Sequence, residues 1–498
     1  MEHRIIDISG IAVAETVVTL AWHKGDTAEQ CALWGVLNES DQAYLRLVSA
    51  ECSGASGEVY YVILPSGARA IVMGLGEREK WTQRKLVLAA RKLATTAQAH
   101  KVVHLTISLV DFAVAGASVA EVMATNIEMA TYVFDKYKSK KNDDGENAKA
   151  DEKKLTDIAY ISNEAEDSDA VSRGAIIGMA VNVARDLTNI PGGDLTPKGL
   201  AQAARDALTS HGVAVTVLGE AEMTELKMGG ILGVSRGSVE EAQLIIMEHK
   251  GGVADAKPIV FAGKGITFDS GGLHIKPSNA MDEMHMDMGG AAAVIGAMQA
   301  IAQMKLPVNV IGLVPAAENM PSGQSYRPGD ILTAMSGTTI EVVSPDAEGR
   351  VVLADALTYA ERYEPSLVVD VATLTGAVIV ALGHYAIGYM TPHEELAVEL
   401  RAASEVSGDY AWQLPLWEEY ESLIKGEIGD VLNAGKNREA GTINGGMFLY
   451  QFAKKFPRWA HCDIASTMTT SKDDILASGA SGSGTRLLIE IARREAAK

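Results

Sequence analysis

Short apolar runs alternate with longer amphipathic segments over most of the chain. Near its beginning, the runs 60–65, 68–76 and 102–109 are rich in apolar residues, which predicts buried strands. Residues 85–99 carry apolar side chains at helical spacing, which predicts an amphipathic helix. Strand and helix signals that alternate in this way indicate a small α/β domain.

A strongly polar segment interrupts the pattern at residues 136–154, where almost no side chain is apolar. Such a composition predicts a solvated linker or a loop excursion. We therefore expect two domains, which fits a length of 498 residues. The N-terminal α/β domain would cover residues 1–160, and a larger C-terminal domain would cover residues 161–498.

The larger domain repeats strand and helix signals. A helix is predicted at about 168–187, and a second begins after Thr196, where a hydroxyl N-cap precedes Pro197, and stops at Gly212. Further strands are predicted at 213–219, 243–248, 258–263, 307–314, 339–343 and 367–371, and further helices at 289–304 and 351–362. The alternation indicates an α/β fold with a mixed sheet covered by helices on both faces. Sites in such sheets form beyond the carboxyl ends of the strands.

Composition narrows the function classes. The net charge of −20 argues against general nucleic-acid binding, which needs a basic footprint, and is most simply explained by solubility. Cys31, Cys52 and Cys462 fit neither a disulfide framework nor a cysteine-rich zinc site, so we expect a reducing compartment. We expect no signal peptide and no transmembrane helix, because no basic start with a long apolar run and no 18 consecutive apolar residues occur. These features predict a cytoplasmic protein without a membrane partner.

Charged residues gather between positions 258 and 294, where an apolar strand ends and an apolar helix begins. Lys264 follows the strand, and Asp269, Lys276 and Asp287 precede the helix. Such charges are costly to bury unless they are paired or bound to metal. On this segment alone, structural ion pairs explain the pattern as well as a metal site does.

A second charged segment follows the strand that ends near Val343. Asp346, Glu348 and Arg350 come at alternating positions in a predicted loop before a helix. Side chains two apart in extended backbone point the same way, so the two carboxylates could form half of a cation site. The arginine could hold an anion opposite them. Alone, the pattern is weak, because a capped helix start with a salt bridge would look the same.

Together the two segments supply four carboxylates that could converge at the strand ends of one sheet: Asp269, Asp287, Asp346 and Glu348. Four like charges in one place repel one another, and cations resolve this repulsion. Four carboxylates can share two divalent ions, and a site of this kind suits hydrolysis. Ligation rich in oxygen accepts Mn²⁺ or Mg²⁺ as well as Zn²⁺.

The motifs GKGITFDSGG, IKPS, MDEMHMDMGGAAAV, PDAEGRVVLADAL and DVATLTGA closely resemble the leucyl (cytosol) aminopeptidase family and occur in the family's order. The resemblance covers roughly residues 165–498, and the linker and the preceding small domain match the family's layout less closely. It implies that the larger domain is the catalytic domain of a two-metal aminopeptidase. The expected reaction removes N-terminal residues from peptides, with Leu and other apolar residues favoured.

The resemblance also implies roles for single residues. The metal ligands would be Lys264, Asp269, Asp287, Asp346 and Glu348. Asp269 and Glu348 would bridge the two ions, Mn²⁺ or Zn²⁺, with Mg²⁺ and Co²⁺ as alternatives. Lys264 would bind as a neutral amine, so its pKa would have to be depressed, which burial beside two dications could cause. Lys276 would polarise the scissile carbonyl. Arg350 would hold a bicarbonate ion that acts as general base toward the bridging water.

The resemblance further implies a specificity pocket of small or soft apolar residues, which suits Leu or Met side chains. Its members would be Met284, Thr373, Gly376, Ala465 and Met468, for which ordinary core packing is the alternative. The family is typically a homohexamer.

Two departures from the family stand out. Ser344-Pro345 replaces the usual Asn-Thr, and because proline lacks an N–H and fixes φ, it could alter the loop. Ser466 replaces a usual glycine and could narrow the pocket.

Two other functions compete with the peptidase hypothesis. A G-x-S-x-G match at residues 233–237 would make Ser235 a serine nucleophile, whose activity would survive a chelator. A non-catalytic scaffold or DNA-binding regulator on the same fold would bind DNA in a salt-dependent way. The glycine-rich run 479–485 lacks the lysine of a phosphate loop and is expected to be a flexible loop near the active site. Asn433, in another glycine-rich loop, has no evident role.

Overall fold

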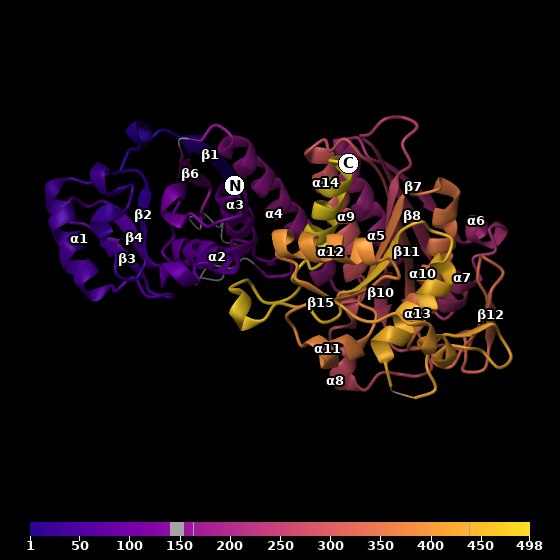
Figure 1. Cartoon of the computed structure of the whole chain (residues 1–498). Helices are drawn as coiled ribbons and strands as arrows, with labels where there is room; N and C mark the ends of the chain where they lie inside the picture. Colours follow the sequence, from indigo (N-terminus) through magenta and orange to yellow (C-terminus); the bar gives the residue numbers. More distant parts are fainter. Residues whose placement is uncertain (140–153, 163, 438) are drawn as a thin grey trace. The chain divides into compact units, whose positions relative to one another are not determined.

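The computed structural model describes residues 1–139, 154–162, 164–437 and 439–498. They form two compact units, drawn mainly in indigo to magenta and in magenta to yellow (Figure 1). The first unit comprises Met1–Met179 and Ser471–Ala477, and the second comprises Ala180–Thr470 and Ser478–Lys498. The boundary expected at residue 160 stays a prediction, and most of the predicted polar linker lies outside the described residues. Within those described ranges, no helix is long and apolar enough to cross a membrane.

The first unit is built on a six-stranded sheet with the order β1-β6-β5-β2-β4-β3. The strands are β1 (Glu2–Ile6), β2 (Val17–Trp22), β3 (Val59–Ile63), β4 (Arg69–Gly74), β5 (His104–Ser108) and β6 (Asp157–Ile161). All neighbours pair in parallel except β3, which pairs antiparallel with β4. The helices of this unit are α1 (Glu39–Glu51), α2 (Gln83–Ala99) and α3 (Val119–Ala130), and α4 (Asp167–Asn189) begins in it.

One expectation for this unit was wrong. The run 60–65 forms a strand, but the strand is not buried, since Tyr60 is 45% exposed and Ile63 is 66% exposed. The reason is that β3 lies at the edge of the sheet, with a neighbour on one side only. A continuous apolar run cannot distinguish an edge strand from a central one.

The second unit contains a nine-stranded mixed sheet with the order β16-β15-β18-β14-β9-β11-β8-β7, in which β10 also pairs with β11. Its strands are β7 (Ala214–Leu218), β8 (Gln243–Lys250), β9 (Ile259–Gly263), β10 (Gly265–Asp269), β11 (Asn309–Asn319), β14 (Leu367–Ala372), β15 (Ile387–Met390), β16 (Ala411–Gln413) and β18 (Trp459–Asp463). The central strands β18, β14, β9 and β11 are parallel. Antiparallel pairs flank them at β15 and β8.

A small separate sheet joins β12 (Ile331–Thr333), β13 (Thr339–Glu341) and β17 (Val431–Leu432). The strand predicted at 339–343 therefore belongs to this sheet and not to the large one. Sequence pattern gives strand character but not the pairing partner.

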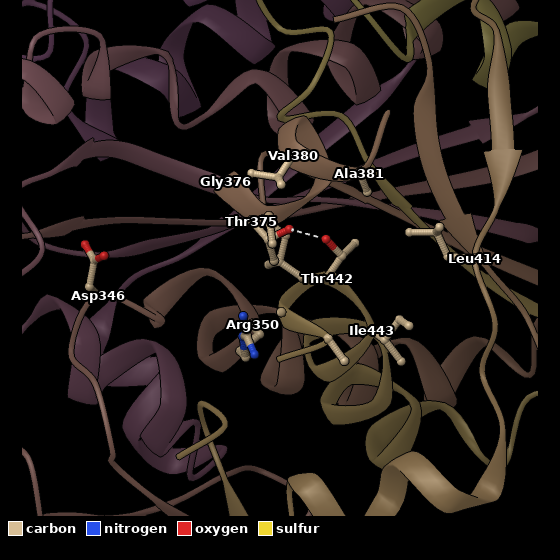
Figure 2. A pocket seen from close by; sticks show the side chains of 13 residues that line it. Asp346, Arg350, Thr375, Gly376, Val380, Ala381, Leu414, Thr442 and Ile443 are labelled. Atoms are coloured by element: carbon tan, nitrogen blue, oxygen red, sulfur yellow. Dashed lines mark hydrogen bonds between the residues drawn. The ribbon is translucent and has the colours of Figure 1, made fainter. Parts of the chain in front are cut away.

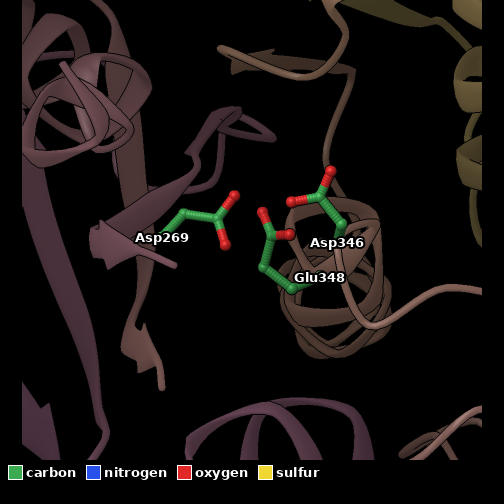
Figure 3. A group of neighbouring side chains, drawn as sticks. All are labelled: Asp269, Asp346 and Glu348. Atoms are coloured by element: carbon green, nitrogen blue, oxygen red, sulfur yellow. The ribbon is translucent and has the colours of Figure 1, made fainter. Parts of the chain in front are cut away.

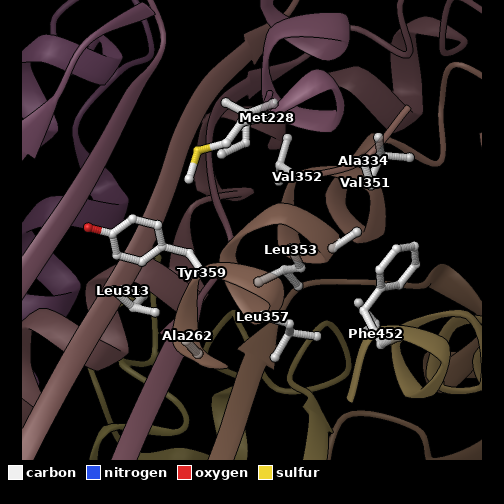
Figure 4. Packing of buried hydrophobic residues seen from close by; sticks show 14 of the residues in the cluster. Met228, Ala262, Leu313, Ala334, Val351, Val352, Leu353, Leu357, Tyr359 and Phe452 are labelled. Carbon is white, nitrogen blue, oxygen red and sulfur yellow. The ribbon is translucent and has the colours of Figure 1, made fainter. Parts of the chain in front are cut away.

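Helices cover the large sheet in two groups. On one side, α9 (Gly289–Gln303) packs on β9, β14 and β11 and contacts α5 (Pro197–Leu208) and α14 (Thr485–Ala496). On the other, α10 (Glu348–Ala360) packs on β11 and β9 and contacts α7 (Gly229–Ser235) and α13 (Gly441–Ala453). Figure 4 shows this second core, where Leu353 and Leu357 of α10 lie near Ala262 and Leu313 of the sheet. The remaining helices are α6 (Glu220–Glu225), α8 (Ser278–Met281), α11 (Gly376–Leu382) and α12 (Glu394–Ser407).

The residue at which a helix begins sets the geometry of the charged segment 346–350. The α5 start follows its cap signal, because Thr196 Oγ1 accepts a hydrogen bond from Gly199 N. In contrast, α10 begins at Glu348, three residues earlier than expected. Glu348 and Arg350 therefore lie in the first helical turn, where residues two apart are rotated by about 200°. An extended backbone was therefore the wrong reason for Glu348 and Arg350, but the expectation that Asp346 and Glu348 share one side is confirmed, because an oxygen of each lies within 4.8 Å of the other.

Candidate active site

Charged and polar side chains gather beyond the carboxyl ends of the parallel strands of the large sheet. Lys264 follows β9, Asp269 ends β10, Thr373 follows β14 and Asp463 ends β18. Asp287 lies two residues before α9, and Glu348 begins α10. This edge is the usual location for sites in open α/β sheets.

Lys264 lies in a buried ionic cluster and is 3% exposed. Its Nζ lies 2.7 Å from Asp287 Oδ2 and 2.8 Å from Glu348 Oε1, and it donates to Thr373 O at 3.1 Å. Burial by itself would lower the pKa of Lys264, but the neighbouring carboxylates outweigh it and raise that pKa. This direction is opposite to the depressed pKa expected for a neutral amine. A neutral Lys264 therefore requires positive charge beyond that of the surrounding side chains.

Lys276 lies in a more accessible position, with a side chain that is 16% exposed. Its Nζ lies 2.9 Å from Asp269 Oδ2 and 2.6 Å from Asp346 Oδ1. Burial lowers the pKa of Lys276, but these carboxylates and Glu348 raise it above its usual value. The lysine is therefore a charged donor that remains partly open to solvent.

Three carboxylates face one another, and we call Asp269, Asp346 and Glu348 the carboxylate cluster (Figure 3). One oxygen of each lies within 4.8 Å of the others. Burial raises the pKa of Asp269 to about 6. The Oε2 atom of Glu348 is buried and has no hydrogen-bond partner among the described residues.

The balance of charges among these side chains favours bound cations. The carboxylate cluster and Asp287 carry four negative charges when ionised, whereas Lys264 and Lys276 carry two positive charges. Burial raises the pKa of Asp287 to about 8, which reflects the cost of an additional buried anion. Closely spaced carboxylate oxygens, an unpaired buried oxygen and a surplus of negative charge fit divalent cations.

Two glycines make the close approach of these groups feasible. Gly271 has φ +85° and donates its N–H to Asp269 Oδ1 at 2.9 Å, so the chain turns sharply just after the carboxylate. Gly349 lies in the first turn of α10, where an added Cβ would be 2.6 Å from Lys264 Nζ. The absence of a side chain at Gly349 lets Lys264 pass beside the helix.

A cavity of about 680 Å³ opens beside Asp346 and Arg350 (Figure 2). Most of its other lining residues are apolar or small: Leu374, Thr375, Gly376, Ala377, Val380, Ala381, Leu414, Ala440, Gly441, Thr442 and Ile443. Of the five residues expected in a specificity pocket, Gly376 lines this cavity. Thr373 instead donates its hydroxyl to Asp287 Oδ1 at 2.7 Å. Met284, Ala465 and Met468 are half-buried outside this lining, and their role stays a prediction.

Arg350 forms part of the cavity wall and is 7% exposed. Burial lowers the pKa of its guanidinium to about 10, while Glu348 and Asp463 oppose this shift. The group therefore stays charged at neutral pH. Its Nε atom has no hydrogen-bond partner within the described part of the chain. A buried guanidinium with an unused donor beside a cavity can hold an anion.

The loop before Asp346 is held despite its proline. The Pro345 carbonyl accepts hydrogen bonds from Tyr326 Oη at 2.6 Å and Asn319 Nδ2 at 2.9 Å. Ser344 O accepts a hydrogen bond from Asn433 Nδ2 at 2.6 Å. The loop is also held through backbone N–H groups, because Val343 N and Ser344 N donate to Asn433 Oδ1 at 2.7 and 3.2 Å. None of these bonds needs an N–H at position 345, so the proline does not break them. They also give Asn433 a structural role that the sequence did not reveal.

Asn319 and Asp463 are further buried residues at this edge that sequence reasoning missed. Asp463 Oδ1 accepts from Leu374 N at 3.0 Å, and its Oδ2 accepts from Thr375 Oγ1 at 2.6 Å. It thereby fixes the segment that lines the cavity. A polar residue that ends a continuous apolar strand is the signal that could have identified both.

The alternative signals gain no support. Ser235 is 2% exposed at the end of α7, and its Oγ lies 3.4 Å from both Glu220 Oε1 and Leu232 O, without a histidine partner among these contacts. The 479–485 segment is packed at Ala480, which is fully buried and whose carbonyl accepts from Arg185 Nε, and its expected flexibility stays a prediction. Ser466 donates its hydroxyl to a backbone carbonyl and does not line the cavity.

Comparison with known proteins places this arrangement in a family. The model of the catalytic domain of the cytosol aminopeptidase family matches residues 182–489, and that of the family's N-terminal domain matches residues 9–141. A "Probable cytosol aminopeptidase" from Methylobacillus flagellatus is 41% identical over 474 residues, covering 93% of both chains. One with the same description from Roseiflexus castenholzii is 48% identical over 378 residues, covering 76% of both. The solved structure "Bottromycin maturation enzyme BotP in complex with Mn" has a TM-score of 0.84 at 31% identity and covers 97% of this chain and 100% of its own.

The fold and these matches first define a peptidase with two domains of mixed α/β structure. More particularly, the chain belongs to the cytosol aminopeptidase family.

Proposed function

We propose that this protein is a two-metal aminopeptidase that removes single residues from the N-terminus of peptides. The observation that carries the proposal is the carboxylate cluster, whose oxygens lie within 4.8 Å of one another beside an unpaired, buried Glu348 oxygen. Family membership supplies the reaction class, and the surplus negative charge supplies the reason for metal dependence.

The proposed ligands are Lys264, Asp269, Asp287, Asp346 and Glu348. Asp269 and Glu348 would bridge the two ions. When bound, the ions would supply an activated water and electrostatic stabilisation of the developing charge. Mn²⁺ or Zn²⁺ suits these donors best, with Mg²⁺ and Co²⁺ as alternatives, and a solved relative is described with Mn.

Two further residues would act on the substrate and its water. Lys276, charged and partly exposed, would donate a hydrogen bond to the scissile carbonyl oxygen as negative charge develops there. Arg350, with its unused Nε donor on the cavity wall, would hold a bicarbonate ion that accepts a proton from the attacking water.

Substrate preference is the finer part of the proposal. An exopeptidase needs a site for the free amino group, and the surplus carboxylates and their ions provide one. Leu and other apolar N-terminal residues are expected to bind against Met284, Thr373, Gly376, Ala465 and Met468. We also infer a homohexamer, and a cytoplasmic location in keeping with the description of the relatives as cytosol aminopeptidases. Light scattering of the purified chain would test the assembly.

Hydrolysis of leucine p-nitroanilide tests the proposed function. The purified protein would be stripped with a chelator and then reloaded separately with Mn²⁺, Zn²⁺, Co²⁺ or Mg²⁺. We expect activity to vanish on stripping, to return with metal, and to be absent in Asp346→Ala at every metal. The order in which the metals restore the rate would rank them.

Two control variants match this design. Asp206→Ala removes an exposed aspartate on α5, far along the chain from the cluster, and should leave activity unchanged. Ser235→Ala should also be fully active. Activity that survives stripping and is lost in Ser235→Ala would refute the metal mechanism and establish the serine nucleophile.

A further inference from the structure

Asn319, the last residue of β11, links two segments that each carry a proposed metal ligand. Its Nδ2 donates to Asp269 Oδ1 at 2.8 Å and to Pro345 O at 2.9 Å. Asp269 ends β10, and Pro345 directly precedes Asp346. One buried amide group therefore contacts both sides of the carboxylate cluster.

The surroundings of Asn319 hold this amide in one place. The residue is fully buried, and its backbone carbonyl accepts hydrogen bonds from Ser270 N at 3.1 Å and Ser270 Oγ at 2.7 Å. A Cβ added at Gly272 would lie 2.9 Å from Asn319 Oδ1, so that turn packs tightly over the side chain. The amide group thus has little freedom to turn away from its two acceptors.

The two carboxylate oxygens of Asp269 have different partners. Asn319 and Gly271 both donate to Oδ1, whereas Oδ2 lies 2.9 Å from Lys276 Nζ. Neutral donors stabilise the ionised carboxylate without adding charge to a crowded site. Donors behind a metal ligand fix its orientation, and their loss typically weakens metal affinity by about 10–100-fold.

We propose that Asn319 is a positioning residue of the metal site. It sets the separation between Asp269 and the Asp346 loop, and it orients Asp269 so that divalent ions bind tightly. This inference rests on the proposed function, since it concerns the same ions, but it assigns a role to a residue outside the proposed set of metal ligands.

Calorimetric titration of Mn²⁺ into the chelator-stripped full chain tests the role without measuring activity. Asn319→Ala removes both donated bonds, and we expect it to bind Mn²⁺ roughly 10–100-fold more weakly than the unaltered protein. Asn319→Leu keeps the branched outline of the side chain while removing the donors, and the same weakening is expected. Circular dichroism and thermal unfolding would establish that each variant is folded.

Tyr326→Phe is the matched control. It removes the other hydrogen bond to Pro345 O but leaves Asp269 and its donors intact. We expect its Mn²⁺ affinity to stay close to that of the unaltered protein. An equal loss in Tyr326→Phe and Asn319→Ala would mean that loop anchoring alone matters, which contradicts the role in orienting Asp269.

The remaining outcomes separate this inference from the proposed function. If the unaltered chain binds Mn²⁺ and both folded Asn319 variants bind it equally well, Asn319 does not position the site. If the unaltered chain binds no Mn²⁺, and no other divalent ion restores its activity, the metal site itself is refuted.

Discussion

The two lysines of the candidate site have the same chemistry but different surroundings. Lys264 is 3% exposed and contacts Asp287 and Glu348, which are equally enclosed. The Lys276 side chain is 16% exposed and contacts the buried Asp269 as well as Asp346, whose side chain is 37% exposed. The inner group can act only on its fixed neighbours, whereas the outer lysine can reach a molecule that enters from solvent. The two residues are of the same type, so it is the degree of burial that separates a lysine confined to its fixed neighbours from one that a ligand could reach.

The largest effect on stability is expected for Lys264, the more buried of the two lysines. Lys264→Met leaves two buried carboxylates without their cation, and breaking a buried pair in this way costs about 3–5 kcal/mol. Denaturant unfolding of the chelator-stripped protein would measure the loss. Lys276→Met, on the outer side, should lose less stability, because one of its two partners, Asp346, has a side chain that is 37% exposed and stays hydrated. Equal losses in the two variants would remove the contrast between the two lysines.

Lys276, the more exposed of the two lysines, should affect kcat. Lys276→Met removes a donor to the developing oxyanion, and such a loss lowers kcat by roughly 10²–10³-fold. Hydrolysis of leucine p-nitroanilide by the metal-loaded enzyme provides the measurement. Lys454→Met removes an exposed lysine that pairs with Glu421 and should leave kcat unchanged. A fall of less than tenfold in Lys276→Met would exclude Lys276 as the principal electrophilic donor.

Asp355 sharpens the comparison, because it is a buried carboxylate without a lysine partner. Its oxygens accept only backbone N–H groups, from Ile231 at 2.9 Å and Met335 at 2.7 Å. Burial outweighs these bonds and raises the pKa of Asp355 to about 7 from its usual 3.8. Between these values the folded state binds the proton and the unfolded state does not, so stability falls as pH rises.

The slope gives the size of this effect. From about pH 4.5 to about pH 6, the unfolding free energy should drop by about 2 kcal/mol relative to that of Asp355→Asn, which cannot titrate there. Parallel denaturant curves at several pH values would measure it. A constant difference between the two proteins would show that Asp355 stays ionised, as its backbone donors would favour.

The smallest effect is expected for a substitution of Thr375. Thr375 Oγ1 caps α11 by accepting from Val378 N at 3.3 Å, and it donates to Asp463 Oδ2. Thr375→Val keeps the shape but removes these two bonds and a third, with Thr442 Oγ1, and loss of a cap typically costs about 1 kcal/mol. Thermal unfolding would detect this loss, and Thr375→Ser should restore most of it. A fully stable Thr375→Val would mean that packing alone holds the segment.

The sequence indicated most elements, because burial imposes strong periodicity on central strands and helices. The α2, α4, α5, α9 and β14 signals match elements of the structure to within a few residues. β10 went unrecognised because it lies in a glycine-rich motif that looks like a loop, and its pairing with β11 depends on distant residues. Edge exposure of β3 and the separate pairing of β13 likewise depend on tertiary contacts.

The charged residues at the site were easier to identify than the residues that hold them. Lysines and aspartates between apolar segments stand out in a sequence, since such charges need a reason to be buried. Asn319 and Asn433 look like ordinary polar residues, and their hydrogen bonds join segments far apart in the chain. The direction of the Lys264 pKa also depends on the summed field of neighbours, which no local pattern provides.

The close approach of Gly349 to Lys264 limits how this chain can vary over evolutionary time. Alanine at position 349 would bring its Cβ to 2.4 Å from Lys264 Cε, so the end of the buried lysine would have to move away from its carboxylate partners. Natural or engineered variation that enlarges residue 349 should therefore disturb the charge arrangement at Lys264, and glycine is the residue expected to persist there.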